Sequence, residues 1–370
     1  MSRSGLDAAE HGGAFWQHLG IDIAHLDRER DVISADVLDA WFAPGPLVLE
    51  GLHEHLEALC RLSPPTHAEG LRVKIAEVRG LPAECVLPTG GSSQSIFQFL
   101  PRFLTPNSKG LILDPTYGEY SHVLERLVGC QVHKLALHRE EGFALVRDRL
   151  IEAARGVDFV GLVNPNSPTG QWTPLETIKQ IRMALDPACL LWIDETYIDY
   201  VGSEQSAEQF ASQTDGVVVS KSMSKAYALS GLRVAYIVAK STQVADLALF
   251  TPPWSVSLPA QAAAILSLQD SAYYEARWTE THTLRRELAT ALSRLNVGEV
   301  FEGAANFLLV FLDPTGPTAA DVAERARARS LFVRDASSMG STLGNHTIRI
   351  AVKDPATNAR IAQILASVVG

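Results

Sequence analysis

The stretch VVVSKSMSKAYALSGLRVAY, residues 217–236, places reactive side chains between two hydrophobic runs. An amine such as that of Lys225 forms an imine with an aldehyde once its surroundings lower its pKa. The hydroxyls of Ser222 and Ser224 and the guanidinium of Arg233 are groups that bind phosphate. The residue types and their spacing therefore predict a site for a phosphorylated aldehyde.

Two loops upstream offer further groups for such a ligand. PTGGSSQSIF follows a hydrophobic run and opens a helical segment, so Ser92 and Ser93 would face an anion at a helix N-terminus. The alternative is an ordinary N-cap. DPTYGEY offers Tyr117 as a flat face for an aromatic ring, although it can equally be a half-buried loop aromatic.

Two later segments suggest what the ring is. NPNSPTG, residues 164–170, either holds a polar ring substituent or is a plain turn. WIDETYIDY ends a hydrophobic run with Asp194, and a buried carboxylate needs a cation or good hydrogen bonds. An N-cap or an ion pair with an arginine would satisfy Asp194, but so would a protonated pyridine nitrogen, with Tyr197 near the ring hydroxyl. Together these groups predict pyridoxal 5′-phosphate, an electron sink for carbanions.

The elements that must position these groups follow an alternating pattern. From about residue 70 to 240, β-branched or leucine-rich runs alternate with amphipathic segments. This predicts an α/β fold, a mostly parallel seven-stranded sheet sandwiched by helices, with function in the loops after the strands. The expected strands are residues 85–88, 110–114, 132–137, 159–164, 190–195, 216–220 and 234–239.

Helical periodicity and a second set of strands define the rest of the chain. Residues 47–62 place Leu49, Leu52, Leu56 and Leu59 on one stripe, and residues 175–185 form a similar helix. A long helical stretch at about 259–295 precedes strands at 306–312 and 346–352 around a helix. We expect an N-terminal arm (1–45) packed on a small C-terminal α/β domain (251–370), with a large cofactor-binding domain (46–250) between them.

Composition narrows the class of partner. The 370 residues carry a formal net charge of −10, which argues against binding nucleic acid or an anionic membrane. The N-terminus has no apolar signal core, and no apolar run reaches the length that spans a bilayer. His53 and His55 do not share a helix face, so we expect no metal. The cysteines fit buried positions in a reducing, cytoplasmic protein: Cys60, Cys85, Cys130 and Cys189.

Five motifs in one order carry a family resemblance: DPTYGEY, NPNSPTG, DETYIDY, S-x-S-K and SGLRVAY. Over nearly its whole length the chain resembles fold-type I pyridoxal-phosphate enzymes of aminotransferase class I/II, most closely the histidinol-phosphate aminotransferase branch. The resemblance implies Lys225 as imine lysine and proton shuttle, Asp194 at the pyridine nitrogen and Tyr197 at the ring hydroxyl. It places Ser222 and Arg233 on the phosphate.

The resemblance also suggests how the substrate binds. Arg349, in TIRIAV, is similar to the arginine that clamps a substrate carboxylate or phosphate, although it can also be paired with a surface acid. Arg334 is the second candidate, unless it pairs with Asp335. Trp41 and Phe42 predict an apolar or bulky portion of the substrate near the entrance. The substrate is expected to be a small anionic amine, and the enzyme a homodimer.

Three departures from the family pattern keep the reaction open. Ser167 replaces an Asn near the cofactor ring, Trp41-Phe42-Ala43 replaces an Asn-Glu-Asn run, and Ser63 replaces a Tyr that reaches the partner's cofactor phosphate. Amino transfer is the main prediction. A lyase, a decarboxylase or an oxidative deaminase is the alternative on the same fold. A regulatory protein without chemistry would need a DNA-binding domain with a basic surface, for which the sequence leaves no room.

Overall fold

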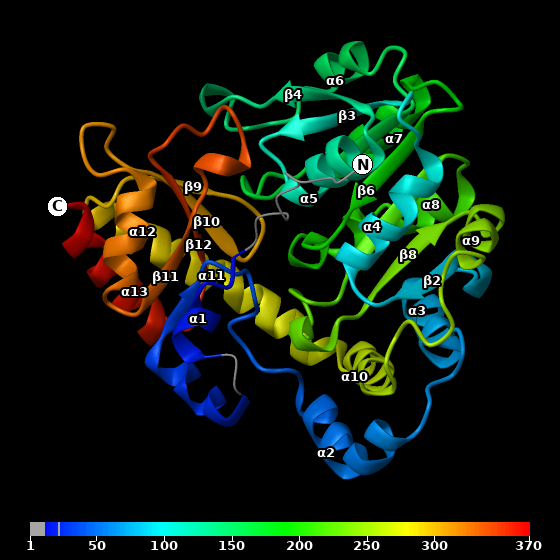
Figure 1. Cartoon of the computed structure of the whole chain (residues 1–370), viewed down its shortest axis with the longest axis horizontal. Coiled ribbons are helices and arrows are strands. Elements are labelled where there is room, and N and C mark those ends of the chain that lie inside the picture. The colour runs from blue at the N-terminus through cyan, green and yellow to red at the C-terminus, as the bar shows by residue number, and fades with distance from the viewer. Residues whose placement is uncertain (1–11, 21–22) are drawn as a thin grey trace, which may run out of the picture.

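The computed structural model describes residues 12–20 and 23–370, which form two β-sheets (Figure 1). The larger sheet has seven strands, and β8 is the strand that runs antiparallel to its two neighbours while the other pairs are parallel. All seven predicted strands are confirmed to within one or two residues. Their spatial order is β2 (Val86–Thr89), β8 (Ala235–Ala239), β7 (Val217–Ser222), β6 (Leu190–Asp194), β5 (Phe159–Val163), β3 (Lys109–Asp114) and β4 (Gln131–Ala136).

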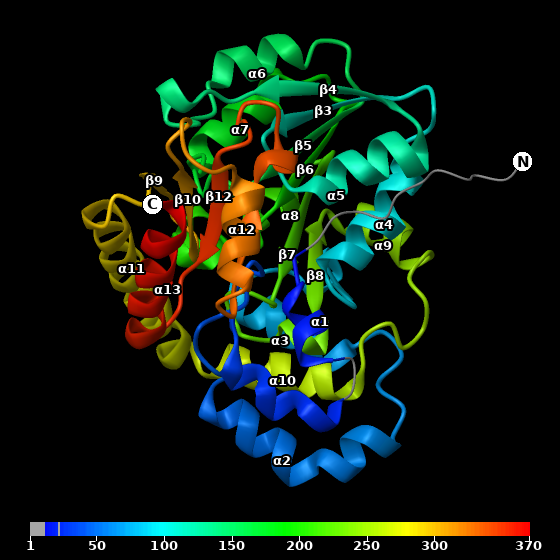
Figure 2. The same cartoon turned by 60° about the vertical axis from the view of Figure 1, so that its left-hand side comes forward.

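Helices cover both faces of this sheet, which is why its central strands are hydrophobic along their whole length (Figure 2). Successive residues of one strand enter different cores: Trp192 packs on one side and Leu191 on the other. The first side carries α4 (Ser92–Phe103) and α9 (Ser241–Ala248). The second side carries α3 (Glu69–Arg79), α6 (Arg147–Ala153), α7 (Leu175–Ala184) and α8 (Glu208–Gln213).

The smaller sheet joins the two ends of the chain. Its order is β1 (Ile33–Ala35), β11 (Leu331–Asp335), β12 (Thr347–Ala351), β10 (Phe307–Phe311) and β9 (Glu299–Glu302). The remaining long helices are α2 (Pro46–Arg61), α10 (Leu258–Gln269), α11 (Ser271–Arg294), α12 (Ala319–Arg327) and α13 (Pro355–Val369). The sequence predicted β10, β12 and a helix between them, but not β1, β9 or β11.

The N-terminal segment lies on this smaller sheet. Strand β1 pairs in parallel with β11, and α1 (Phe15–Leu19) shares a hydrophobic cluster with Phe332. Residues 1–11 and 21–22 of the expected arm lie outside the described residues. The boundaries expected at residues 45 and 250 stay a prediction.

Helix α2 forms where expected, but its leucines do not form one buried stripe. A Cβ at Gly51 would lie 2.6 Å from Leu266 Cδ1, so α2 approaches α10 closely at this glycine. This contact turns Leu59 inward, whereas Leu49 and Leu56 remain 48% and 55% exposed. The helix therefore packs on one edge of the predicted stripe, and Leu49 and Leu56 lie on its exposed edge. The stretch 259–295 is likewise two helices, α10 and α11, rather than one.

The cysteines are the first of three remaining features that the sequence addressed. All four cysteines are free; Cys85, Cys130 and Cys189 are buried, but Cys60 is exposed near the end of α2, contrary to the prediction. No described helix combines the length and the apolar composition that crossing a bilayer requires. Within residues 12–20 and 23–370, no three His, Cys, Asp or Glu side chains are grouped so that they could hold a metal ion.

Candidate active site

The structure brings all the side chains predicted to contact the cofactor into one cavity of about 130 Å³. The cavity lies where β3, β5, β6 and β7 end, because the carboxyl ends of parallel strands meet at one edge of the sheet. Val163 and Thr196 also line it. The predicted residues in its wall are Ser92, Ser93, Tyr117, Ser167, Asp194, Tyr197, Ser222, Ser224, Lys225 and Arg233.

One end of the cavity is suited to an anion. Arg233 Nη1 donates to Ser224 Oγ at 3.3 Å and to the Ser230 carbonyl at 3.0 Å. The guanidinium lies over Gly91, the N-cap of α4, where a Cβ would come within 2.6 Å of Arg233 Nη2. Gly91 also has φ +107°, so both its conformation and this contact require glycine. With Ser222 beside them, these groups form a cradle that can hold a phosphate.

The serines at the start of α4 are not ordinary caps. Helix α4 begins at Ser92 after Gly91, and no side chain caps it. Ser93 Oγ donates to Glu119 Oε1 at 2.8 Å, a contact that the sequence did not predict. Tyr117 is half-buried and meets the Tyr120 ring edge to face at 6.3 Å; burial and the nearby Glu119 charge raise the pKa of Tyr117.

Asp194 is 2% exposed and is held by neutral groups. It accepts hydrogen bonds from Tyr120 Oη at 2.8 Å, from Thr196 N at 3.0 Å and from Thr196 Oγ1 at 2.6 Å. Trp192 Nε1 donates to the same Tyr120 oxygen at 2.9 Å. Burial raises the pKa of Asp194, although the hydrogen bonds from Tyr120 and Thr196 act to lower it. In the described part of the chain no lysine or arginine forms an ion pair with Asp194, so the ion-pair alternative is wrong.

Arg349 is a buried cation without an acid. Its Nη1 donates to Ser167 Oγ at 3.1 Å and its Nη2 to the Asp36 carbonyl at 3.2 Å, while Nε has no hydrogen-bond partner. Its guanidinium lies 5.7 Å from the centre of the Phe307 ring, and burial lowers the pKa of Arg349. No carboxylate among residues 12–20 and 23–370 forms a salt bridge with Arg349, so the surface-pair alternative is wrong.

Tyr197 connects the cavity to the smaller sheet. Its ring meets Phe307 edge to face at 5.4 Å, and burial raises the pKa of its hydroxyl. Arg334, the second candidate for an anion, is the Cα partner of Arg349 across β11 and β12. Asp335 accepts hydrogen bonds from the Ser337 amide at 2.9 Å and hydroxyl at 2.6 Å. The site therefore extends across both sheets.

The aromatic residues expected at the entrance, Trp41 and Phe42, pack against α11. Trp41 Nε1 donates to Thr281 Oγ1 at 2.8 Å on α11, and Phe42 packs against Tyr273 and Tyr274. Trp41, Phe42 and Arg349 are not among the residues that line the cavity, and the place of Trp41 and Phe42 near the entrance stays a prediction.

The same segment sends a different residue into the site. Asp39 Oδ1 accepts a hydrogen bond from Lys225 Nζ at 2.7 Å. The contact joins residues far apart in sequence, and the sequence analysis did not predict it.

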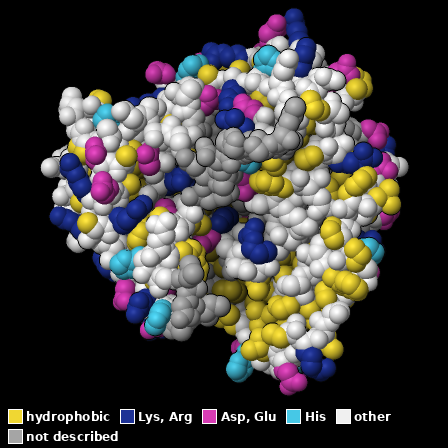
Figure 3. Space-filling model, in the orientation of Figure 1, with side chains coloured by type: hydrophobic (Ala, Val, Ile, Leu, Met, Phe, Trp, Pro, Cys, Tyr) yellow, Lys and Arg dark blue, Asp and Glu magenta, His cyan; other side chains and the backbone are white. Residues whose placement is uncertain are grey.

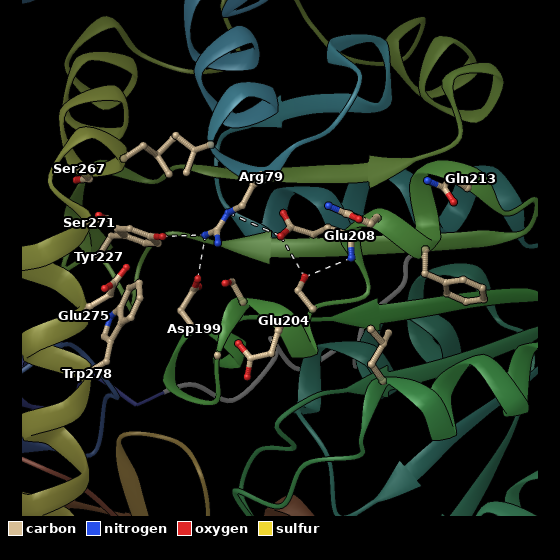
Figure 4. A pocket seen from close by; sticks show the side chains of 18 of the residues that line it. Arg79, Asp199, Glu204, Glu208, Gln213, Tyr227, Ser267, Ser271, Glu275 and Trp278 are labelled. Carbon is tan, nitrogen blue, oxygen red and sulfur yellow. Dashed lines mark hydrogen bonds and ion pairs between the residues drawn. The ribbon is translucent and has the colours of Figure 1, made fainter.

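A larger cavity of about 920 Å³ lies between α3, α8 and the start of α11 (Figure 4). Arg79 Nη2 donates to Asp199 Oδ1 at 2.9 Å and to Tyr227 Oη at 2.8 Å, and Arg79 Nε lies 3.7 Å from Glu208 Oε2. Lys221 Nζ lies 3.3 Å from Asp199 and 3.4 Å from Glu208. None of the residues predicted to contact the cofactor lines this cavity.

The fold and the smaller cavity define a class of protein, the fold-type I pyridoxal-phosphate enzymes. The histidinol-phosphate aminotransferase from Sinorhizobium meliloti, solved with pyridoxal 5′-phosphate, has a TM-score of 0.82 at 20% identity and covers 99% of both chains. The family model for aminotransferase class I and II matches residues 48–365, and the chain belongs to that family. It is a pyridoxal-phosphate-dependent aminotransferase that resembles histidinol-phosphate aminotransferases.

Two further proteins are similar to the chain. The histidinol-phosphate aminotransferase of Acinetobacter baumannii (strain SDF) is 31% identical over 333 residues, which cover 88% of this chain and 87% of the relative. The L-threonine-O-3-phosphate decarboxylase of Porphyromonas gingivalis has a TM-score of 0.79 at 25% identity, covering 91% of this chain and 99% of the other. The family resemblance expected from the motifs is confirmed.

The residues present fit this cofactor. The cradle at Gly91 and Arg233 offers donors to a phosphate, and the buried Asp194 has no cation of its own in the described chain. Lys225 reaches into the cavity between these two ends. The phosphate dianion of the cofactor would supply the negative charge at the cradle, and its protonated ring nitrogen the positive charge beside Asp194.

Proposed function

We propose that the protein transfers the amino group of a small amine that also carries a carboxylate or phosphate, and that Arg349 binds this anion. The observation that carries the proposal is the burial of Arg349 beside Ser167 without an acidic partner in the described chain. A buried cation is costly unless an anion joins it, and a guanidinium binds carboxylate or phosphate through two parallel hydrogen bonds. The names of the relatives make a phosphorylated amine a natural first candidate.

Lys225 is proposed to bind the cofactor and to move the proton at the substrate α carbon. Burial lowers the pKa of Lys225, and the charges of Arg349 and Arg233 act in the same direction, against Asp39. A lowered pKa makes the neutral amine available as nucleophile and base. When bound, the cofactor supplies an electron sink for the electron pair left at the α carbon.

The other groups are proposed to orient the cofactor. Asp194 would face the ring nitrogen, Tyr197 and Ser167 the ring hydroxyl, and Tyr117 one face of the ring. These positions are supported by the shared cavity and by the neutral partners of Asp194. The phosphate would be held by Ser92, Ser93, Ser222, Ser224 and Arg233.

Matched pairs of amines test the proposal. The purified protein with pyridoxal phosphate is mixed with histidinol phosphate or histidinol, and with amino acids or their amides, and its absorbance is followed. We expect the anion-bearing member of a pair to change the absorbance and an added keto acid to reverse the change. An equal response to both members would contradict the role of Arg349, and Arg349→Lys should remove the preference for the anion.

The same experiment distinguishes amino transfer from the second candidate function, that of a decarboxylase or an oxidative enzyme. The similarity to the Porphyromonas gingivalis decarboxylase and the contact of Ser167 with Arg349 favour keeping it. Release of carbon dioxide or peroxide with unchanged cofactor absorbance would identify this chemistry and would contradict amino transfer.

A homodimer is proposed from an apolar surface. Hydrophobic side chains gather over α2 and α10 on the lower part of the face in Figure 3. Exposed apolar patches of this kind mark association surfaces. We expect a dimer in light scattering, and a monomer for Leu49→Glu combined with Leu56→Glu. The exposed apolar residues of α2 include Leu47, Leu49 and Leu56.

A cytoplasmic location is proposed as well. All four cysteines are free, as expected in a reducing compartment. Fractionation of the source cells should recover the protein with cytoplasmic markers; recovery outside that fraction would contradict the proposal.

A further inference from the structure

The segment 36–39, directly after β1, lies beside the smaller cavity and contacts Arg349 and Lys225. The Asp36 carbonyl accepts a hydrogen bond from Arg349 Nη2 at 3.2 Å, and the Leu38 carbonyl accepts one from Asn306 Nδ2 at 3.0 Å. These two contacts fix the backbone against the smaller sheet. The next side chain in the segment, Asp39, then meets Lys225 at 2.7 Å. A single short segment therefore contacts both the proposed anion clamp and the proposed cofactor lysine.

We propose that Asp39 is the counter-ion of the Lys225 amine. When a substrate amino group takes the place of that amine, Asp39 is its counter-ion as well. The inference rests on the proposed role of Lys225 and adds to it a residue that acts on the same nitrogen. Asp39 forms the one salt bridge of Lys225 within the described chain. Its side chain is 41% exposed, so it remains accessible to an amine that enters from solvent.

The charges around Lys225 explain why a carboxylate matters there. Arg349 and Arg233 both disfavour a positive charge on Lys225, and burial acts in the same direction. Burial by itself would raise the pKa of Asp39; Lys225, its hydrogen bonds and the charge of Lys353 outweigh this and leave that pKa below its ordinary value. Asp39 is therefore ionised at neutral pH and balances a site that is otherwise rich in cations.

The same balance applies to the bond between Lys225 and the cofactor. A protonated nitrogen in that bond is the more electrophilic form, and an adjacent carboxylate favours it. A substrate ammonium group that arrives at the same place would meet the same carboxylate. Asp39 thus favours the protonated form of whichever nitrogen occupies this position.

The first test uses the cofactor-free protein. The rate of Lys225 acetylation by acetic anhydride is measured against pH, with the modified peptide identified by mass spectrometry. In Asp39→Asn the pKa of Lys225 should fall by about one unit or more, so that acetylation near neutral pH is about tenfold faster. An unchanged profile would overturn the inference. Asp39→Ser is measured in parallel in case the asparagine variant does not fold.

A matched control comes from the surface of the protein. Lys240 Nζ and Asp215 Oδ2 are also 2.7 Å apart, but both side chains lie in solvent away from the cavity. Asp215→Asn should leave the acetylation profile of Lys225 unchanged. A shift of the same size in this variant would mean that the effect does not arise at Asp39.

The second test uses the holoenzyme and separates the two proposals. The visible absorbance of the bound cofactor reports the protonation of its bond to Lys225. In Asp39→Asn the midpoint of the pH titration should move down by about one unit, and Asp39→Glu should restore it. A cofactor that does not attach to Lys225 in the wild type would contradict the proposed function. A cofactor on Lys225 with the same midpoint in both Asp39→Asn and wild type would contradict the role of Asp39 alone.

Discussion

Lys221 and Lys225 are four residues apart and lie in opposite electrostatic settings. Lys221 is buried between Asp199 at 3.3 Å and Glu208 at 3.4 Å, in the wall behind the larger cavity. Lys225 enters the smaller cavity, where its one salt bridge within the described chain is to the partly exposed Asp39. Beside the cavity of about 920 Å³, Arg79 is paired with Asp199 and Glu208, whereas in the cavity of about 130 Å³ the buried Asp194 has no cationic partner within the described chain.

We infer from this difference that unpaired buried charge, rather than cavity volume, marks the candidate active site. Buried ions need partners, and where the protein supplies both signs, as with Arg79 and Asp199, the group has a structural role. Where only one sign is present, as at Arg349 and Asp194, a ligand must supply the other. The same reasoning assigns opposite consequences to substitutions in the two regions.

The largest expected effect is on activity in the smaller cavity. Lys225→Ala should lower kcat by at least about 10³-fold, since it removes the proposed proton carrier. The melting temperature should change little, because Asp39, which loses its ion-pair partner, is 41% exposed and can be hydrated. Lys225→Arg, which keeps the charge but is a poor nucleophile, is the control and should be equally inactive. Substantial turnover by either variant would remove Lys225 from the mechanism.

The next effect is on stability in the larger cavity. Lys221→Met should lower the free energy of unfolding by about 3–5 kcal/mol. The reason is that two buried carboxylates, Asp199 and Glu208, would then share a single cation, Arg79. Urea denaturation followed by circular dichroism measures this. The folded fraction should retain kcat. An inactive variant of normal stability would contradict the division between the two regions.

A smaller effect is expected at the anion clamp. Arg349→Ala should lower kcat/KM for the anionic substrate by about 10- to 100-fold, the size expected for charged hydrogen bonds of about 1.5–3 kcal/mol. The loss should be much smaller for the matched amine without the anion. Steady-state kinetics on both amines provide the measurement, and equal losses would show that Arg349 only supports the fold.

The smallest expected effect is the pH dependence of the free energy of unfolding that arises from Glu195, which lies in the network of Lys221. Burial raises the pKa of Glu195 from 4.5 to about 7, against the charge of Lys221. The folded protein thus holds a proton that the unfolded chain has released in this window. The free energy of unfolding should therefore fall, on the order of 2 kcal/mol, as pH rises from 4.5 to about 7.

Glu195→Gln should flatten this dependence. A glutamine side chain can accept a hydrogen bond from the Ala207 amide and donate one to Ser206 Oγ. It therefore keeps a hydrogen bond to both partners of Glu195. Urea denaturation at several pH values compares the two proteins. A slope that persists in the variant would place the responsible proton on another group.

The large sheet could be predicted because its strands are continuous hydrophobic runs. The residues that line the smaller cavity could be predicted because most of them lie at or soon after the ends of those strands; Arg233 lies just before β8. Strand β1 was missed since it has three residues and pairs with β11 about 300 residues away along the chain. Such pairing leaves no local pattern.

Contacts between distant segments explain the other differences. Trp41 packs against Thr281 and Phe42 against Tyr273, both on α11. The sequence could not show this packing, because the two segments are far apart along the chain. Tyr120, which holds Asp194, and Asp39, which meets Lys225, were missed for the same reason. Charge balance at a site depends on these tertiary contacts and becomes visible only in the structure.

The most direct measurement distinguishes the two lysines. The holoenzyme is reduced with borohydride, digested and mapped by mass spectrometry. The cofactor mass should be attached to Lys225 and absent from Lys221. A cofactor found on Lys221 or on any other lysine, or a reduced protein that carries none, would contradict the assignment of the smaller cavity as the active site.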